Sequence, residues 1–316
     1  MHEPFQDGRA DAVTGDRGSI PGAEGPAFTL ELSTSLSLPL LIAVPHAGRA
    51  YPETVIASMR QPELAAPRLE DRYADALGRE LARLTGAPLL IADAPRAMLD
   101  LNRAPDDIDW GMVSRGGGKA PAHSLANRRA RSGLGLVPRR LPGIGELWKV
   151  PLQRDQLEAR IASIHRPYHR TLAQVLEALR DRWGAALLID LHSMPPLKPG
   201  PGNAKPAEFV LGDRFGASCD PILSALVLNE IGDAGRRIAH NRPYAGGYVL
   251  DCHAAPRRGI HALQLEVCRS TYLDSRLEKP GPRLGTVARL LARTIRSLAD
   301  EVARLGDGGA MCQAAE

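Results

Sequence analysis

A histidine follows each of two apolar segments in this chain, and the polar residues around the two histidines suggest a metal site. Residues 40–44 lead into Pro45-His46-Ala47-Gly48, and residues 185–189 lead into Asp190-Leu191-His192-Ser193. Side chains alternate between the two faces of a strand, so Asp190 and His192 project to the same side. In open α/β sheets, ligands sit beyond the carboxyl ends of the strands, which is where both histidines would lie. The pattern therefore predicts two ligands of one metal ion.

Two aspartates are candidates for a third ligand. Asp71 and Asp75 are four residues apart in a helix predicted over residues 68–84, so they share one face near its N-terminal end. Acidic residues there also suit the helix dipole, which would explain them without a metal. Because this helix begins in the loop after the His46 strand, Asp71 is favoured to complete a two-histidine, one-carboxylate set. Asp75 remains the alternative.

Other polar residues are placed where a substrate would bind. Glu266 lies in a predicted strand over residues 260–267, where a carboxylate is costly unless it is paired or functional. Asn102 and Arg103 end an alternating segment, residues 97–103, that is predicted to be a strand. An arginine at the end of an apolar strand is typical of a carboxylate anchor. His165 and His169 have a spacing that can bind zinc, but no Glu follows the first histidine, and a structural role is favoured.

Apolar strands interleaved with helices predict a three-layer α/β/α architecture with a mixed central sheet. Long helices are expected over residues 153–182 and 284–305. Residues 27–306 would form a single catalytic domain. Residues 1–26 are expected to be a disordered arm, and residues 307–316 a frayed tail. Residues 106–151, rich in Gly and Arg, predict an irregular loop that could act as a lid.

Composition limits the kinds of partner. The 316 residues carry a net charge of +4, yet aromatic residues are only 4%, and no nucleic-acid-binding motif occurs. We therefore expect solvated arginines, some of which hold a small acidic substrate, and no nucleic-acid partner. No apolar run approaches the ~20 residues needed to cross a bilayer, and no secretory signal precedes the first strand. Four cysteines without CxxC spacing predict reduced thiols in a cytoplasmic protein. The oligomeric state is left open.

Assembled in order, these pieces resemble the N-formylglutamate amidohydrolase family. The matching motifs span about residues 39–275. They are Val44-Pro45-His46-Ala47-Gly48, Asp71, Leu99-Asp100-Leu101-Asn102-Arg103, Arg166-Pro167-Tyr168-His169, Asp190-Leu191-His192-Ser193, Gly246-Gly247-Tyr248 and Gln264-Leu265-Glu266-Val267-Cys268-Arg269. The resemblance implies a phosphorylase/hydrolase-like fold, distantly similar to zinc carboxypeptidases.

The resemblance also implies roles for individual residues. Zn²⁺ would be held by His46, Asp71 and His192, and Glu266 would be the general base and acid. The predicted substrate-binding residues are Asn102, Arg103, Arg242 and Tyr248. Arg103 or Arg242 would also stabilise the oxyanion that forms when water attacks the acyl carbon.

The expected reaction is zinc-dependent hydrolysis of N-formyl-L-glutamate to formate and L-glutamate, a step of histidine degradation. One alternative is a related amidohydrolase for another N-acyl amino acid or amide, with residues 106–151 reshaping its specificity. Another is a non-catalytic binder of small acidic ligands. No Gly-x-Ser-x-Gly motif occurs, which excludes a serine nucleophile of the α/β-hydrolase type.

Overall fold

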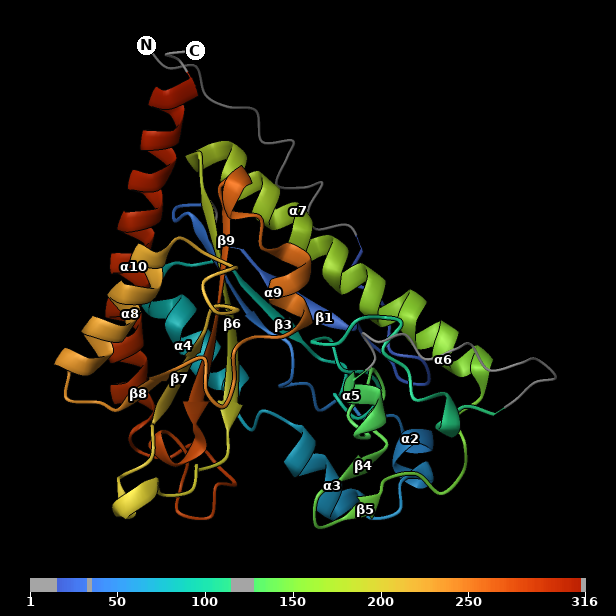
Figure 1. Cartoon of the computed structure of the whole chain (residues 1–316). Helices are drawn as coiled ribbons and strands as arrows, with labels where there is room; N and C mark the ends of the chain where they lie inside the picture. The colour runs from blue at the N-terminus through green and yellow to red at the C-terminus, as the bar shows by residue number, and fades with distance from the viewer. Residues whose placement is uncertain (1–15, 33–35, 115–127, 314–316) are drawn as a thin grey trace.

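A seven-stranded mixed sheet forms the centre of the computed structural model, which describes residues 16–32, 36–114 and 128–313 (Figure 1). The strand order is β1-β3-β2-β6-β9-β7-β8. The strands are β1 (Phe28–Glu31), β2 (Leu40–Val44), β3 (Leu89–Ala92), β6 (Ala186–Met194), β7 (Phe209–Gly212), β8 (Ile238–His240) and β9 (Ile260–Cys268). The four central strands β3, β2, β6 and β9 are parallel, so their carboxyl ends meet at one edge of the sheet.

Helices cover both faces of this sheet, which confirms the predicted three-layer α/β/α architecture (Figure 1). One layer contains α4 (Ala74–Thr85), α8 (Pro221–Asp233) and α10 (Leu284–Gln313), and the other contains α7 (Arg166–Trp183) and α9 (Tyr248–His253). In β6, Ile189 and Leu191 pack into the core under α4, α8 and α10, whereas Leu188 packs into the core under α7. Burial on both faces explains why these strands are almost continuously apolar.

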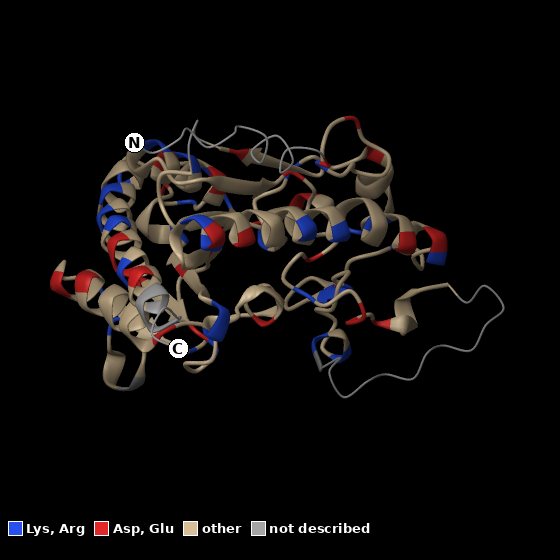
Figure 2. Cartoon of the chain, turned by 90° about the horizontal axis from the view of Figure 1, so that it is seen from above, with Lys and Arg blue, Asp and Glu red and all other residues tan. Residues whose placement is uncertain are grey.

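Shorter elements gather beside the sheet, below α7 in Figure 1. They are the helices α2 (Glu53–Ser58), α3 (Pro62–Leu69), α5 (Arg128–Arg131) and α6 (Arg154–Arg160) and the hairpin strands β4 (Arg140–Leu141) and β5 (Gly145–Glu146). Seen from above, Lys and Arg alternate with Asp and Glu along the long outer helices (Figure 2). This mixture agrees with the expectation that most arginines are solvated surface residues.

The predicted helix over residues 68–84 is wrong, because two helices occur there. α3 ends at Leu69, α4 begins at Ala74, and Asp71 lies in the connection between them. The Asp71 backbone N–H donates to the His46 carbonyl at 2.8 Å, which ties this connection to the loop after β2. Asp71 and Asp75 therefore do not share a helix face.

The predicted strand over residues 97–103 is also wrong, because this segment consists of turns. The Asp100 carboxylate accepts a hydrogen bond from the Asn102 backbone N–H at 2.8 Å, and Arg103 N donates to Asp100 O at 3.1 Å. An aspartate that bonds its own backbone two residues on stabilises a turn. The alternation of apolar residues that suggested a strand here reflects burial of this turn.

A continuous helical segment runs from α6 through a π-helical turn, Ile161–His165, into α7. The sequence predicts a helix over this range, with a kink or break at Pro167. Pro167 instead lies in the first turn of α7, directly after the π-helical turn, where the hydrogen-bonding pattern has already changed. This turn places His165 on the side of residues 95–103.

Two described segments near the chain ends differ from the sequence prediction. Residues 16–26, assigned above to a disordered arm, pack on the domain: Ile20 is buried, and Ser19 N donates to Ser163 O at 2.9 Å. α10 continues to Gln313, where fraying was expected. Residues 1–15 and 314–316, and Gly116-Gly117-Gly118 of the possible lid, lie outside the described residues. Within the described ranges, no helix combines the length and apolarity that crossing a membrane requires.

Candidate metal centre and substrate pocket

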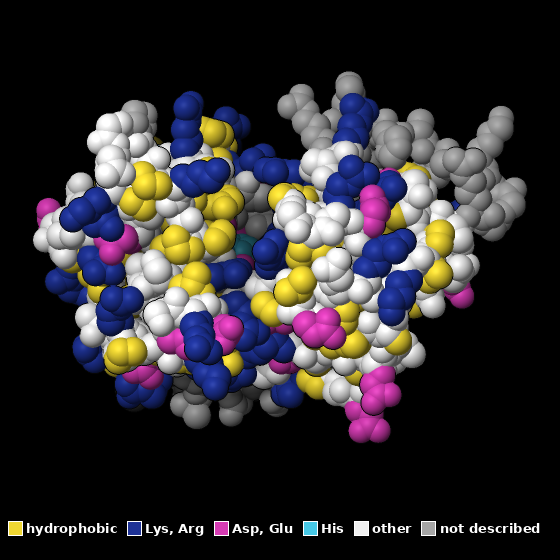
Figure 3. Space-filling model, turned by 90° about the horizontal axis from the view of Figure 1, so that it is seen from below, with side chains coloured by type: hydrophobic (Ala, Val, Ile, Leu, Met, Phe, Trp, Pro, Cys, Tyr) yellow, Lys and Arg dark blue, Asp and Glu magenta, His cyan; other side chains and the backbone are white. Residues whose placement is uncertain are grey.

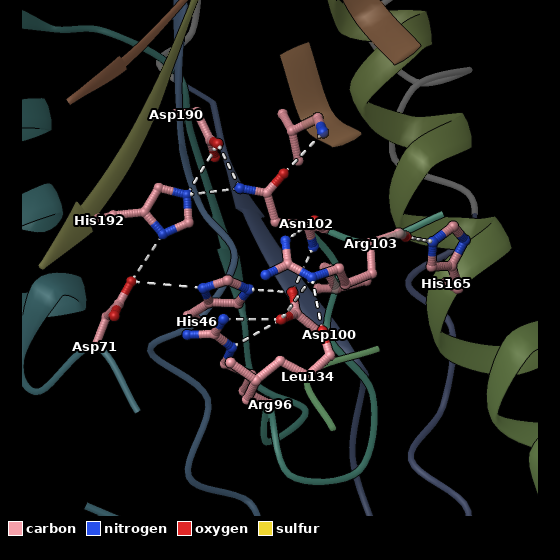
Figure 4. Close-up of polar contacts among 12 residues, drawn as sticks. His46, Asp71, Arg96, Asp100, Asn102, Arg103, Leu134, His165, Asp190 and His192 are labelled. Atoms are coloured by element: carbon pink, nitrogen blue, oxygen red, sulfur yellow. Dashed lines mark hydrogen bonds and ion pairs between the residues drawn. The ribbon is translucent and has the colours of Figure 1, made fainter. Parts of the chain in front are cut away.

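The carboxyl ends of β2 and β6 bring His46 and His192 together, and the α3–α4 connection adds Asp71 (Figure 4). The ligand-type atoms of these three buried residues lie within 4.8 Å of one another. Asp71 Oδ2 is 2.9 Å from His192 Nδ1 and 3.6 Å from His46 Nδ1. Asp75 lies elsewhere, in an ion pair with Arg49 at 2.6 Å. The structure thus groups Asp71, and not Asp75, with the two histidines.

A second carboxylate holds each histidine from behind. His46 Nε2 lies 2.7 Å from Asp100 Oδ1, and His192 Nε2 lies 2.9 Å from Asp190 Oδ2. These contacts direct both Nδ1 atoms toward Asp71, as the outer carboxylates of many metal sites do for their histidines. The predicted position of Asp190 and His192 on one face of a strand is confirmed. Asp100 belongs to a motif quoted above, but the sequence did not indicate this role.

These residues fit a zinc ion. Within the described chain, His46 Nδ1 is buried and has no hydrogen-bond partner, an arrangement that is costly unless something else binds the nitrogen. Burial works to raise the Asp71 pKa, but its contacts with His192 and His46 outweigh burial and lower the pKa, so the carboxylate is charged. Two imidazole nitrogens and one carboxylate form a donor set that zinc accepts with one position left open.

A second group, His169, Cys252 and His253, also has its ligand-type atoms within 4.8 Å of one another. Here the imidazoles are already hydrogen-bonded: His169 Nδ1 lies 2.8 Å from His253 Nε2, and His169 Nε2 donates to Leu101 O at 3.0 Å. His165 Nε2 donates in the same way to Arg103 O at 3.0 Å. His165 and His169 therefore support the turn that carries Asn102 and Arg103, which agrees with the structural role favoured by the sequence.

Acid is expected to destabilise the metal-free protein through this second group. Burial lowers the pKa of His253 to about 4 and that of His169 well below its usual value. Between pH 6.5 and pH 4, the unfolded chain binds a proton at His253 that the folded chain does not. The free energy of unfolding should therefore fall by up to about 3 kcal/mol over this interval. Urea unfolding of the chelated wild type and of His253→Gln at several pH values measures this change in the free energy of unfolding. The same pH dependence in both proteins would contradict the prediction.

Glu266 lies beside the candidate metal centre on the neighbouring strand. In the parallel pairing of β6 with β9, Glu266 is opposite His192 and Gln264 is opposite Asp190, so all four side chains share one sheet face. Gln264 Nε2 donates to Glu266 Oε1 at 3.2 Å. Burial raises the Glu266 pKa to about 7, with a further increase from Asp71 and opposing effects from His192 and Arg96. A carboxyl group with a pKa near neutrality is suited to accept and return a proton.

Arginines supply positive charge around this group. Arg96 donates from Nε to Asp100 Oδ2 at 2.9 Å, and its charge also acts on Asp71 and Glu266. Arg103 donates from Nη1 to Asn102 O at 2.7 Å and from Nε to Leu134 O at 3.0 Å. Viewed from below, the molecule is hollowed, with Lys and Arg on the rim and a His side chain inside (Figure 3). Sequence reasoning missed Arg96; its spacing of four from Asp100 was the available signal.

Asn102 is a central contact between the turn and the sheet. Its Oδ1 accepts from the Val249 backbone N–H at 2.9 Å, and its Nδ2 donates to Gln264 Oε1 at 3.3 Å and to Asp190 Oδ2 at 3.4 Å. A Cβ atom at Gly247 would lie 2.5 Å from Asn102 Oδ1, so this close approach requires glycine. Asn102 therefore positions the start of α9, and a direct contact with substrate remains a prediction.

The last two predicted substrate residues lie in or next to the loop before α9. The Tyr248 ring contacts the rings of His165 and His169, with centroids 5.7 Å and 5.2 Å away. Arg242 is exposed and makes no hydrogen bond or ion pair with any residue that the structure describes. The substrate-binding roles of both residues remain predictions.

Arg269 supports Asp71 from the end of β9. Its Nη2 donates to the Glu70 carbonyl and lies 3.7 Å from Asp71 Oδ1, and its Nε donates to Ser193 Oγ at 3.2 Å. The side chain is buried and thus joins the α3–α4 connection to the carboxyl end of β6. Arg269 belongs to a quoted motif, but its spacing from Asp71 is too long for local sequence patterns to reveal the contact.

Comparison with known proteins agrees with the resemblance drawn from the motifs. The sequence profile of N-formylglutamate amidohydrolase matches residues 38–273. The N-formylglutamate deformylase of Pseudomonas putida is 32% identical over 240 residues, covering 75% of this chain and 82% of the relative. The enzyme of the same name from Pseudomonas aeruginosa is 30% identical over 281 residues, covering 85% and 94%. The crystal structure of N-formylglutamate amidohydrolase from Ralstonia eutropha JMP134 superposes with a TM-score of 0.76 at 31% identity, covering 88% and 99%.

Proposed function

Because the chain belongs to the N-formylglutamate amidohydrolase family, we propose that it hydrolyses N-formyl-L-glutamate to formate and L-glutamate with the help of a bound zinc ion. The relatives' names support the substrate, and His46, Asp71 and His192 would hold the metal. The observation that carries the proposal is the buried, unpartnered Nδ1 of His46, which lies beside Asp71 and faces the same space as His192 Nδ1. A bound zinc ion would supply Lewis-acid activation of water and of the formyl carbonyl.

Glu266 would carry the proton in this reaction. Its carboxylate would take a proton from the attacking water as the water oxygen bonds to the formyl carbon. The same proton would then pass to the amide nitrogen as the C–N bond breaks, releasing formate and the free amine of glutamate. Glu266 is well placed for both steps because it lies opposite His192 on the adjoining strand and on the same face. Its raised pKa, about 7, favours return of the proton as well as its removal.

Arg103 would bind one of the two carboxylates of the substrate. Its Nε and Nη1 donate to backbone carbonyls, which fixes the guanidinium, while Nη2 has no partner among the described residues. Arg96, partly neutralised by Asp100, would add positive potential beside the reacting carbonyl. A planar guanidinium held in this way is preorganised for a carboxylate.

A formate-release assay tests the reaction. Metal-quantified protein should release formate from N-formyl-L-glutamate, lose this activity in a chelator, and regain it with Zn²⁺. N-formyl-L-glutamine and N-acetyl-L-glutamate should be poorer substrates, because one lacks a carboxylate and the other has a larger acyl group. Faster turnover of another acyl amino acid would favour the alternative specificity, and ligand binding without formate release would indicate a non-catalytic binder.

Loss of the Arg103 charge should weaken substrate binding. Arg103→Met is expected to raise KM for N-formyl-L-glutamate about 10–100-fold, the loss expected for a charge-assisted hydrogen bond. Arg257→Met is the matched comparison, because Arg257 is exposed, has no hydrogen bond or ion pair within the described structure and is not a predicted site residue. Steady-state kinetics of both variants measure the difference. An equal rise in KM for Arg257→Met would show that the effect is not specific to Arg103, and an unchanged KM for Arg103→Met would remove Arg103 from the substrate site.

A further inference from the structure

A cavity of about 140 Å³ lies between α2, residues 148–152 and α6. None of the residues that line it belongs to the candidate metal centre. Most of its wall is apolar, with contributions from Val55, Met112, Val137, Trp148 and Leu152. The charged residue in the wall is Arg160, at the end of α6.

Arg160 is a buried cation without a counter-ion in the described part of the chain. Only 7% of the residue is exposed. Its Nη1 donates to Met98 O at 3.0 Å, and its guanidinium carbon lies 6.0 Å from the centroid of the Trp148 ring. Nε and Nη2 have no hydrogen-bond partner among the described residues. Burial lowers the Arg160 pKa to about 10, and no acidic group offsets this effect.

A mostly buried guanidinium without a counter-ion is unfavourable, so an anion at the cavity wall beside Nε and Nη2 would stabilise it. The two free donors, Nε and Nη2, form one edge of the planar guanidinium, which matches the two oxygens of a carboxylate. A single cation balances a single negative charge, and the apolar wall suits a hydrocarbon body. A phosphate dianion would leave charge unbalanced beside apolar side chains.

We propose that this cavity binds a small monocarboxylate with an apolar body, whose carboxylate pairs with Nε and Nη2 of Arg160. This ligand differs in class from the dicarboxylate substrate proposed above. The site also has a physical link to the metal centre, because the Met98 carbonyl that accepts from Arg160 lies in the turn between Arg96 and Asp100. Asp100 in turn holds His46.

Calorimetric titration of the full chain with benzoate and with neutral benzamide tests the site. We expect one benzoate site, with benzamide at least about tenfold weaker because it lacks the charge. Arg160→Met should weaken benzoate by a similar factor. Arg166→Met, an exposed arginine six residues along the same helical segment, should bind benzoate like wild type. Equal benzoate affinity in wild type and Arg160→Met, or equal affinity for benzoate and benzamide, would overturn the proposal.

A crystal of the wild-type protein soaked in 4-bromobenzoate provides a test that does not depend on any variant folding. The expected result is a bromine anomalous peak in the cavity with the carboxylate against the Arg160 guanidinium. A peak confined to the Arg96 and Arg103 region, or a cavity that contains only water, would overturn the proposal. Neither experiment measures formate release. A negative result for the cavity is therefore distinguishable from a failure of the proposed hydrolysis.

Discussion

Replacement of Glu266 by Gln is expected to lower kcat for formate release about 10²–10⁴-fold, the usual contribution of a positioned general base and acid. Glutamine has nearly the same shape and can keep the contact with Gln264, but its amide cannot take a proton from water. His46, Asp71 and His192 are unchanged in this variant. Metal analysis should therefore still find the zinc content of the wild type, and KM should change less than kcat.

The matched control is Glu63→Gln, at an exposed position of α3. It makes the same chemical change on the surface and should retain wild-type kinetics. Near wild-type kcat in Glu266→Gln at full metal content would exclude Glu266 as the proton carrier. A parallel loss of metal would show instead that Glu266 supports the metal ligands. Circular dichroism would show whether such a variant is still folded.

The second large effect is expected at Asp71. Asp71→Asn removes the charged oxygen that lies 2.9 Å from His192 Nδ1 and 3.6 Å from His46 Nδ1. An amide is a poor ligand for zinc, so the purified variant should contain little metal, and kcat/KM should fall by about 10³-fold or more. Metal content by mass spectrometry and formate release at added Zn²⁺ measure the two effects.

Asp75→Asn is the paired variant, since it makes the same change four residues away. Asp75 bonds Arg49 and lies outside the histidine group, so this variant should keep its zinc and most of its activity. The two aspartates were both candidates on sequence grounds, and the pair of variants separates them directly. Loss of metal in Asp75→Asn with retention in Asp71→Asn would reverse the assignment.

Strand-borne residues were the part of the site that the sequence could predict. In β6 and β9 the side chains alternate with period two, so the shared face of Asp190 and His192, and that of Gln264 and Glu266, followed from their spacing alone. The continuous apolar runs before His46 and within β6 indicated buried parallel strands, and the rule that ligands gather at strand ends placed both histidines at one edge.

Residues in turns could not be placed in this way, because turns have no repeating period. The α3–α4 connection, which carries Asp71, was predicted as helix, and the segment that carries Asp100 and Arg103 was predicted as strand. Residues 97–103 contain apolar side chains whose burial imitates the alternation of a strand. Residues 70–73 lie between two true helices, so the sequence predicted a single helix across them. What determines their conformation is hydrogen bonding to distant backbone, such as Asp71 N to His46 O.

By itself, then, the sequence predicted the α/β/α class, the positions of two histidines at strand ends, the carboxylate of Glu266 within a strand, and the family. Only the tertiary structure grouped Asp71, and not Asp75, with the two histidines and placed Asp100 behind His46. It also left Arg160 without an acidic partner, within the described chain, beside a cavity. The physical reason is that strand periodicity is a local property of the chain. Contacts between residues 46 and 100, or between 71 and 192, depend on how whole layers pack, which no local pattern records.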